Sequence, residues 1–333
     1  MKRLAVVFLA VLMAVSALSC ANAEVDPADV KVAGIVYQDD QFMSSLIEGY
    51  TAACEEYGVT LYTANVQNDQ GKEIELIETY TIQGVSGIAI APMDPSSSIR
   101  ALRDASEMGV KIAITNMEID DADFIVCGFT SNDYNNAHQL GEAAAQRLLA
   151  QFGEETIKMG IINYEDMTPE QSQNREAGFL AALDEAGVKY EVVAEATGSS
   201  IEMSMQAGTD MMTAHPEIQV LYACNGLGYI GPYNAFKDTD YVGNLIIYGY
   251  DANDMTTDWL FDETPLVYGE VAQDPYLMGY NAMKILLQNI FGEDTSEYAG
   301  RCEYVPGAVL MYDEPETVNA WRVSMGYPEF VTE

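Results

Sequence analysis

Residues that could bind a small molecule follow the apolar segments of this 333-residue chain. The stretch "YQDDQFMSS" places Asp39, Asp40 and Phe42 directly after the apolar run at 31–37. Carboxylate oxygens accept hydrogen bonds from hydroxyl groups, and an aromatic ring packs against C–H groups. Asp is also a favoured N-cap, whose side chain accepts a backbone N–H at the start of a helix. Taken alone, the stretch fits ligand contact and helix capping equally well.

Similar polar residues recur where later apolar runs end. In chain order, the candidate binding residues are Asp40, Phe42, Asn116, Arg175, Asn225, Asp251 and Gln273. Their carboxylate and amide oxygens accept hydrogen bonds, whereas amide NH2 groups and guanidinium donate them. A sugar needs both kinds of partner around its rim and an apolar surface against its C–H face. The set therefore predicts a binding site for an uncharged ligand with many hydroxyl groups.

Strand-like apolar runs alternate with helical stretches in two successive series. The runs of the first series are 31–37, 59–64, 87–92, 111–115 and 124–129, and those of the second are 158–163, 189–196, 219–224, 245–251 and 265–271. Regular βα alternation predicts an α/β fold with parallel sheets covered by helices on both faces. The restart of the series predicts two doubly wound lobes. Ligands of such sheets bind outside the carboxyl ends of the strands, where the candidate residues lie.

The first 23 residues have the pattern of a secretory signal peptide. Lys2 and Arg3 precede an apolar stretch at 4–18, and the small residues at 19–23 end before Glu24. The cysteine at position 20 also fits a relaxed lipoprotein site, at which Cys20 would carry a lipid. No later segment is apolar and long enough to cross a membrane. We therefore expect a periplasmic or extracellular protein that is soluble or tethered only at its start.

The charge balance excludes several classes of partner. The chain contains 52 Asp and Glu residues against 15 Lys and Arg, which gives a formal net charge of −37. Such a surface repels nucleic acids and anionic membranes. The widely spaced cysteines, Cys54, Cys127, Cys224 and Cys302, match neither a zinc site nor a CxxC pair. Buried thiols and disulfides both remain open for them, and no metal or cofactor is expected.

One motif resembles a dinucleotide site. The stretch "GLGYIG" (Gly226–Gly231) fits G-x-G-x-x-G after an apolar run, and Asp251 follows twenty residues beyond it. However, Pro232 follows the last Gly, where a phosphate-binding helix should run without interruption. Close packing of a helix on a strand beside Asn225 is therefore the preferred interpretation.

Four segments carry a family resemblance. The quoted stretch with its preceding residue, "VYQDDQFMSS", together with "VQNDQGKEIE", "TNME" and "TAHPEIQVLYACN", resembles the periplasmic sugar-binding proteins of ABC importers, specifically their ribose and galactose/glucose group. The resemblance runs from about Lys31 to about Tyr312. It implies the type I periplasmic binding protein fold, in which two lobes are joined by a three-strand hinge. The expected crossings lie near Ser131, near Asp274 and near Val305–Pro306.

The resemblance also implies roles for the candidate residues. Asp40 would accept hydrogen bonds from ligand hydroxyls, Phe42 would stack on the sugar, and Asn116 would bind from the same lobe. Asn225, Asp251 and Gln273 would complete the ring of contacts from the second lobe. Arg175 would reach a ring or hydroxyl oxygen, although a shift of one or two residues would place Gln173 or Asn174 there instead.

The chain departs from the family pattern in three places. Residues 197–202 stand where a second stacking aromatic is expected, and Tyr164 or Tyr229 could replace it. Met117 occupies the position of a basic residue of the ribose branch. The segment "QFGEETIKMG" lacks the acidic calcium loop of the galactose branch. These differences affect which sugar is expected more than whether a sugar binds.

The expected domain organisation is a signal peptide at 1–23, a first lobe at 30–131 and 274–304, and a second lobe at 132–273 and 305–330. The expected function is capture of a galactose-like or glucose-like hexose, or of a pentose, by lobe closure and its delivery to an ABC permease. The protein would act as a monomer without catalysis or cofactor. A sensor that presents its closed form to a chemoreceptor or a histidine kinase is the alternative, and a sugar-modifying enzyme is the alternative of another class.

Overall fold

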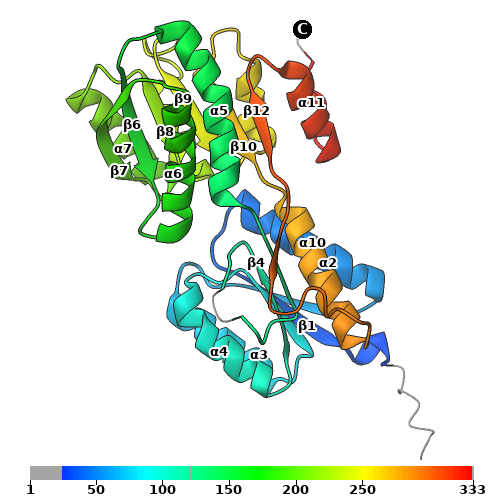
Figure 1. Cartoon of the computed structure of the whole chain (residues 1–333). Coiled ribbons are helices and arrows are strands. Elements are labelled where there is room, and N and C mark those ends of the chain that lie inside the picture. The colour runs from blue at the N-terminus through cyan, green and yellow to red at the C-terminus, as the bar shows by residue number, and fades with distance from the viewer. Residues whose placement is uncertain (1–24, 120–121, 332–333) are drawn as a thin grey trace, which may run out of the picture.

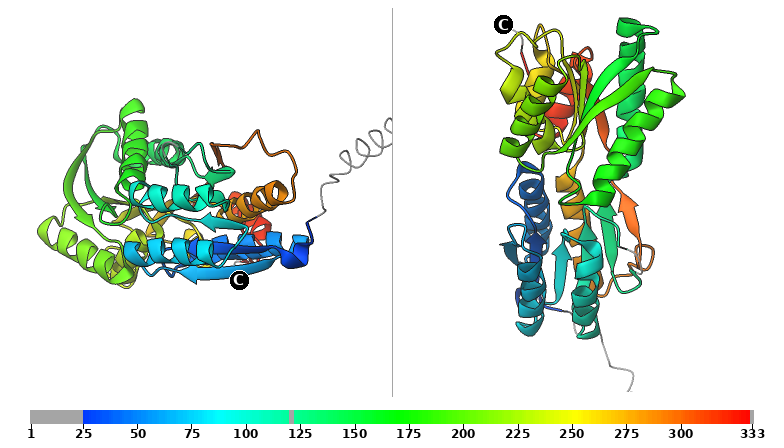
Figure 2. Two further views of the ribbon diagram at one scale, coloured as in Figure 1. Left: turned by 90° about the horizontal axis from the view of Figure 1, so that it is seen from below. Right: turned by 90° about the vertical axis from the view of Figure 1, so that its left-hand side faces the viewer.

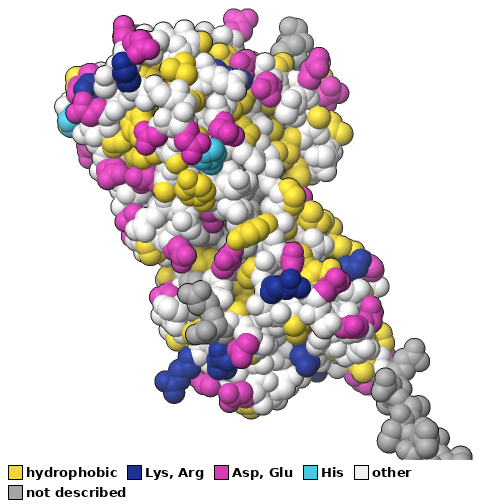
Figure 3. Space-filling view, in the orientation of Figure 1, with side chains coloured by type: hydrophobic (Ala, Val, Ile, Leu, Met, Phe, Trp, Pro, Cys, Tyr) yellow, Lys and Arg dark blue, Asp and Glu magenta, His cyan; other side chains and the backbone are white. Residues whose placement is uncertain are grey.

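The computed structural model describes residues 25–119 and 122–331 of the chain. The expected signal peptide and Cys20 lie outside these described residues. Within them, two lobes are stacked along the long axis of the molecule (Figures 1 and 2). Acidic side chains are spread over both lobes on the face that Figure 3 shows. None of the described helices is long and apolar enough to span a lipid bilayer.

The first lobe is built on a parallel sheet. Its strand order is β11-β5-β4-β3-β1-β2. The strands are β1 (Lys31–Val36), β2 (Thr60–Asn65), β3 (Gly87–Ile90), β4 (Lys111–Thr115), β5 (Cys127–Thr130) and β11 (Cys302–Tyr304). A short 3-10 turn, η1 (Pro27–Asp29), precedes β1, and the covering helices are α2 (Gln41–Tyr57), α3 (Gln70–Ile82), α4 (Pro95–Glu107) and α10 (Pro275–Ile290). Helices α2 and α10 pack together on one side of the sheet, and α3 packs with α4 on the other.

The second lobe repeats this plan with the strand order β12-β10-β9-β8-β6-β7. The strands are β6 (Ile157–Asn163), β7 (Tyr190–Thr197), β8 (Val220–Ala223), β9 (Ile246–Tyr250), β10 (Val267–Ala272) and β12 (Ala308–Met311). The helices are α5 (Asp133–Phe152), α6 (Pro169–Glu185), α7 (Ile201–Ala214), α8 (Gly226–Phe236), α9 (Asp254–Asp258), η2 (Trp259–Phe261) and α11 (Pro315–Ser324). Helices α5 and α6 pack together, as do α7 and α8. The predicted two-lobe α/β fold is therefore confirmed.

Strand β12 departs from the all-parallel prediction, because it pairs antiparallel with β10. The cause lies in the route of the chain. Strand β11 runs parallel to β5 and ends at the edge of the first sheet that faces the second lobe. Residues 305–307 then lead into β12 with no intervening helix, so the chain enters the second sheet from its carboxyl edge and must run against its neighbours.

Within the described residues the chain passes between the two sheets three times. It leaves β5 for α5 through Ser131 and Asn132, and it leaves β10 for α10 through Gln273 and Asp274. The third passage is the 305–307 segment. Helix α10 follows the second sheet in sequence but packs on α2 and β4 of the first lobe. The lobe boundaries at 131/132, 273/274 and 304/305 remain a prediction.

A close helix crossing holds each lobe together. In the first lobe, a Cβ atom at Gly49 of α2 would overlap the carbonyl oxygen of Tyr276 in α10. In the second lobe, a Cβ atom at Gly178 of α6 would overlap the carbonyl oxygen of Tyr134 in α5. Glycine at these positions lets the helix backbones touch, and the apolar residues around the crossings fill the remaining space.

We predict that Gly49→Ala destabilises the protein by about 1–3 kcal/mol, because the added methyl group forces α2 and α10 apart in a packed core. The matched control is Gly71→Ala on the exposed first turn of α3, which should be neutral or stabilise by up to about 1 kcal/mol. Chemical denaturation measures both changes. Equal stability of Gly49→Ala and the native protein would show that the crossing tolerates a side chain.

Candidate functional site

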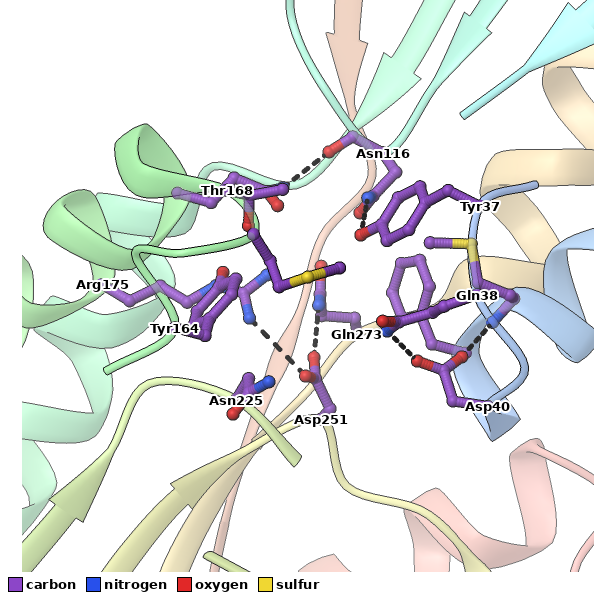
Figure 4. A pocket seen from close by; sticks show the side chains of 14 residues that line it. Tyr37, Gln38, Asp40, Asn116, Tyr164, Thr168, Arg175, Asn225, Asp251 and Gln273 are labelled. Carbon is purple, nitrogen blue, oxygen red and sulfur yellow. Dashed lines mark hydrogen bonds and ion pairs between the residues drawn. The ribbon is translucent and has the colours of Figure 1, made fainter. Parts of the chain in front are cut away.

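A pocket lies between the facing carboxyl ends of the two sheets (Figure 4). It is lined by Tyr37, Gln38, Asp40, Phe42, Met43, Asn116, Tyr164, Met167, Thr168, Gln171, Arg175, Asn225, Asp251 and Gln273. The structure thus brings all seven candidate binding residues into one pocket. Asp39, the neighbour of Asp40, is exposed and does not line it. The role of each residue toward a ligand remains a prediction.

Two of the lining residues have a left-handed backbone at a strand end. Asn116 follows β4 with φ of 69°, and Asp251 follows β9 with φ of 74°. Asn and Asp adopt this conformation at less cost than other residues with a Cβ atom. The turn takes the chain out of the sheet where the two lobes face each other. Backbone geometry as well as side-chain chemistry therefore favours Asn and Asp at these positions.

Asp40 and Asn225 each combine helix capping with a place in the pocket. Asp40 is the N-cap of α2, where its Oδ1 accepts a hydrogen bond from the Met43 N–H at 2.7 Å, and its Oδ2 accepts one from Gln38 Nε2. Asn225 is the N-cap of α8, where its Oδ1 accepts the Gly228 N–H at 2.9 Å. Capping and pocket lining are therefore compatible at both residues, since the cap fixes the side chain at the wall of the pocket.

Arg175 is the central charge of the site and is only 3% exposed. Its Nε donates to Asp133 Oδ1 at 2.7 Å, and its Nη1 donates to the Cys224 carbonyl at 3.0 Å and lies 3.5 Å from Asp251 Oδ2. The guanidinium stacks 3.8 Å from the centre of the Tyr250 ring. Burial alone would disfavour the charge, but the two carboxylates outweigh it and raise the pKa of Arg175. Arg175 is therefore charged at any physiological pH.

The structure also distinguishes Arg175 from its neighbours Gln173 and Asn174 on α6. Arg175 is buried in the pocket wall, whereas Gln173 and Asn174 are exposed and do not line the pocket. The helix explains this, because residues two positions apart point to different sides. Gln171, which lies one turn before Arg175, lines the pocket with it.

Of the two tyrosines considered as a second stacking ring, only Tyr164 lines the pocket. The choice of Tyr229 is wrong. Its ring lies in the core of the second lobe, edge-on to Trp259 with 6.0 Å between ring centres, and its hydroxyl donates to Glu270 Oε2. The residue sits on α8 facing β9, where Gly249 leaves room for the ring.

The motif at 226–231 serves packing. A Cβ atom at Gly231 would overlap the Ser204 hydroxyl and lie only 2.4 Å from the Met205 nitrogen of α7, so glycine permits α8 to pack against α7. The expectation that Pro232 interrupts the helix is wrong, because α8 continues through Pro232 to Phe236. Tertiary packing on both sides of α8 keeps the chain helical at that position.

Sequence reasoning missed several lining residues. Tyr37 and Gln38 directly follow β1, so the strand-end rule that found Asp40 would also have found them. Met167, Thr168 and Gln171 come from the connection between β6 and α6 and from the first turn of α6, and no pattern distinguishes them in the sequence. Two of the lining hydroxyls, Tyr164 Oη and Thr168 Oγ1, are buried without a hydrogen-bond partner among the described residues.

The two lobes already touch at one side of the pocket. Gln171 Nε2 of the second lobe donates to the Asn116 carbonyl of the first lobe at 2.8 Å. Met167 packs against the hydrophobic cores of both lobes. The side chain of Asn116 bonds within its own lobe, where its Nδ2 donates to Tyr37 Oη at 3.3 Å.

The structure decides between thiols and disulfides for the widely spaced cysteines. The four cysteines among the described residues are free thiols, and Cys54, Cys127 and Cys224 are buried. Burial raises the pKa of Cys54 to about 12, so this thiol stays protonated. These residues act as small apolar core side chains.

A buried carboxyl lies behind the pocket. Glu270 of β10 is fully buried, and burial raises its pKa to about 7. Since an unfolded Glu titrates near 4.3, the folded state holds this proton more tightly. The resulting stabilisation is complete below about pH 4 and is lost as the pH rises through 7.

We predict that Glu270→Gln removes this pH dependence. At pH 8 the variant should be more stable than the native protein by up to about 3 kcal/mol, because its amide stays neutral and still accepts the Tyr229 hydrogen bond. At pH 4 the two should be equally stable. Urea denaturation across this pH range measures the difference, with Glu78→Gln on the exposed face of α3 as control. A variant less stable than the native protein at pH 8 would contradict the assignment.

Comparison with known proteins identifies the family to which the chain belongs. A family model described as "Periplasmic binding protein domain" matches residues 32–294. The chain belongs to this family, whose members bind substrates and are not enzymes. Membership implies a periplasmic location.

Individual relatives support the same class. The chain is 25% identical to the ABC transporter periplasmic-binding protein YphF of Escherichia coli (strain K12), over 68% of this chain and 69% of the relative. It is 28% identical to the D-ribose/D-allose-binding protein of Pseudomonas aeruginosa, over 56% of this chain and 57% of the relative. A solved ABC transporter periplasmic solute-binding protein from Actinobacillus succinogenes 130Z with bound D-allose matches with a TM-score of 0.76 and 17% identity, covering 87% of this chain and 100% of that one. The resemblance to ABC importer binding proteins is confirmed.

Proposed function

We propose that the protein captures an uncharged monosaccharide, a hexose or a pentose, by closure of its two lobes and delivers it to an ABC permease. The observation that carries this proposal is the convergence of polar side chains from both lobes on one pocket. The printed name of one relative, a D-ribose/D-allose-binding protein, supports the same ligand class. We propose further that the chain acts as a monomer.

The lining groups suit a polyol. Carboxylates at Asp40 and Asp251 accept hydrogen bonds from hydroxyls, and the amides of Asn225 and Gln273 both donate and accept. The hydroxyls of Tyr164 and Thr168 find no hydrogen-bond partner in the part of the chain that the structure describes, although a buried polar atom normally has one. A sugar hydroxyl would supply one. Phe42 offers an apolar ring at the same wall.

The charge of the pocket favours a neutral ligand over an acidic one. Arg175 is the cation of the pocket lining, and it is already paired with two carboxylates, Asp133 and Asp251. The carboxylate of Asp40 remains, with neutral donors from Gln38 and Met43 as its hydrogen-bond partners. A carboxylate or phosphate on the ligand would therefore meet a site with surplus negative charge.

Closure is proposed to occur about the three passages between the sheets. The contact between Gln171 and Asn116 already joins the lobes on one side of the pocket. A ligand that bridges Asp40 on the first lobe and Asp251 on the second would favour the closed form, because it binds that form more tightly than the open one.

A thermal-shift screen of pentoses and aldohexoses, followed by calorimetry, tests the function. A bound sugar at one hundred times its Kd should stabilise the protein by about 2.7 kcal/mol and raise its Tm accordingly. Absence of a shift with every pentose and aldohexose at millimolar concentration would contradict the proposal.

We predict that Asp40→Asn separates capping from ligand binding. Asn is an equally good N-cap, so the Tm should change little. Affinity for the sugar should fall by about 1.5–3 kcal/mol, the value of a hydrogen bond to a charged acceptor. The control is Asp39→Asn, which alters an exposed neighbouring carboxylate. Native affinity in Asp40→Asn would remove Asp40 from the site.

We also predict discrimination against sugar acids. A uronic acid or sugar phosphate derived from the bound sugar should bind at least about tenfold more weakly, because its charge faces Asp40 in a partly desolvated site. Calorimetry of the matched pair at pH 7.5 measures this. A sugar acid that binds as tightly as its parent would show that Arg175 is available to the ligand.

A further inference from the structure

A second cavity continues from the sugar pocket toward helix α11. The two share Gln38, Asp40, Phe42, Asn225, Asp251 and Gln273, so they adjoin each other. Seventeen residues line the second cavity, and eleven of them do not line the first, so the space extends beyond the polar pocket.

The chemistry of the second cavity differs from that of the first. The residues that only the second cavity has include the apolar side chains Leu227, Ile230, Trp321, Met325 and Tyr327, which we call the apolar annex. The polar residues that line only the second cavity are few and neutral, such as Gln41 and Asn253. The space therefore changes from a polar pocket to an apolar one.

The annex is held in place by the second lobe. Trp321 of α11 and Met325, the C-cap residue of that helix, lie one turn apart and share one side of it. The adjacent Arg322 is buried and anchors this part of the helix, because its Nη2 donates to Asp254 Oδ1 at 2.7 Å and its Nε donates to the Pro328 carbonyl at 3.0 Å. The Trp321 ring also packs against Tyr327, with 5.8 Å between ring centres. Trp321 is thus fixed against the second lobe while one side of it lines the cavity.

We propose that the cleft binds a glycoside, with the sugar ring in the polar pocket and an apolar aryl or alkyl aglycone in the annex. This inference rests on the proposed sugar-binding function and extends it. A polar ring joined to an apolar group matches the two halves of the space in order. An apolar wall beside a polyol site favours binding because it removes apolar ligand surface from water. A free monosaccharide has no apolar substituent to place against this wall.

The experiment is a matched calorimetric series on the full chain. The probes are D-ribose, D-glucose, D-galactose and D-allose, each as the free sugar and as its methyl and phenyl glycosides in both anomers. For the sugar that fits the polar pocket, one phenyl glycoside should bind at least about tenfold more tightly than the free sugar. The methyl glycoside should fall between them.

Variants of α11 locate the effect. Trp321→Ala should weaken the phenyl glycoside at least tenfold and change the affinity for the free sugar less than twofold. Val323→Ala, on the exposed side of the same helix, is the control and should change neither. If Trp321→Ala fails to fold, Met325→Gln at the half-buried neighbouring position should lower the phenyl preference in the same way.

The outcomes separate this inference from the proposed function. Binding of free sugars with rejection of every glycoside would overturn the glycoside proposal and leave sugar capture intact. Equal losses for free sugar and phenyl glycoside in Trp321→Ala would also overturn it, because the annex would then be a surface that closes against α2. Binding of no probe at all would overturn both.

Discussion

A guanidinium group that is almost completely removed from water must be surrounded by oxygen atoms, since an unpaired buried charge costs several kilocalories per mole. Arg175 meets this requirement with Asp133, Asp251 and the Cys224 carbonyl, and it stacks on Tyr250. These partners come from the start of α5, the end of β9 and the end of β8. The ion cluster therefore fixes three strand and helix ends of the second lobe relative to one another, and the pocket wall is built on it.

The same cluster decides which ligands suit the pocket. Because Arg175 is already paired with carboxylates of the protein, it does not act as a free cation. Its remaining N–H groups can donate hydrogen bonds to an uncharged ligand. Asp251 is held by Gln273 at 2.5 Å and by the Gly226 N–H at 3.0 Å, so its carboxylate is oriented before any ligand arrives. Preorganised polar groups lose little freedom on binding, which favours recognition of a small polar molecule.

The two lobes contribute differently to the space between them. The first lobe offers Asp40, Phe42 and Asn116 from strand ends and from the start of a helix, whereas the second adds a polar wall on α6 and an apolar wall on α11. The α6 wall contacts the first lobe across the pocket through Gln171 and Met167. Among the described residues, the α11 side lacks such a hydrogen bond, and this is the side where the cavity is larger and apolar.

The alternation of apolar runs and helices was sufficient to predict two parallel-sheet lobes, because burial on both faces leaves a continuous apolar signature in each strand. The rule that ligands meet the carboxyl ends of such strands located Asp40, Asn116, Asn225 and Asp251 without any coordinates. Local chemistry could not predict Met167, Thr168 or Gln171, since these residues reach the pocket only through the way β6 and α6 are placed against the first lobe. Nor could it reveal the antiparallel β12, the passage of α8 through Pro232, or the annex on α11. Those features depend on contacts between segments far apart in the chain, and a sequence pattern records the burial of a residue without recording which distant residue buries it.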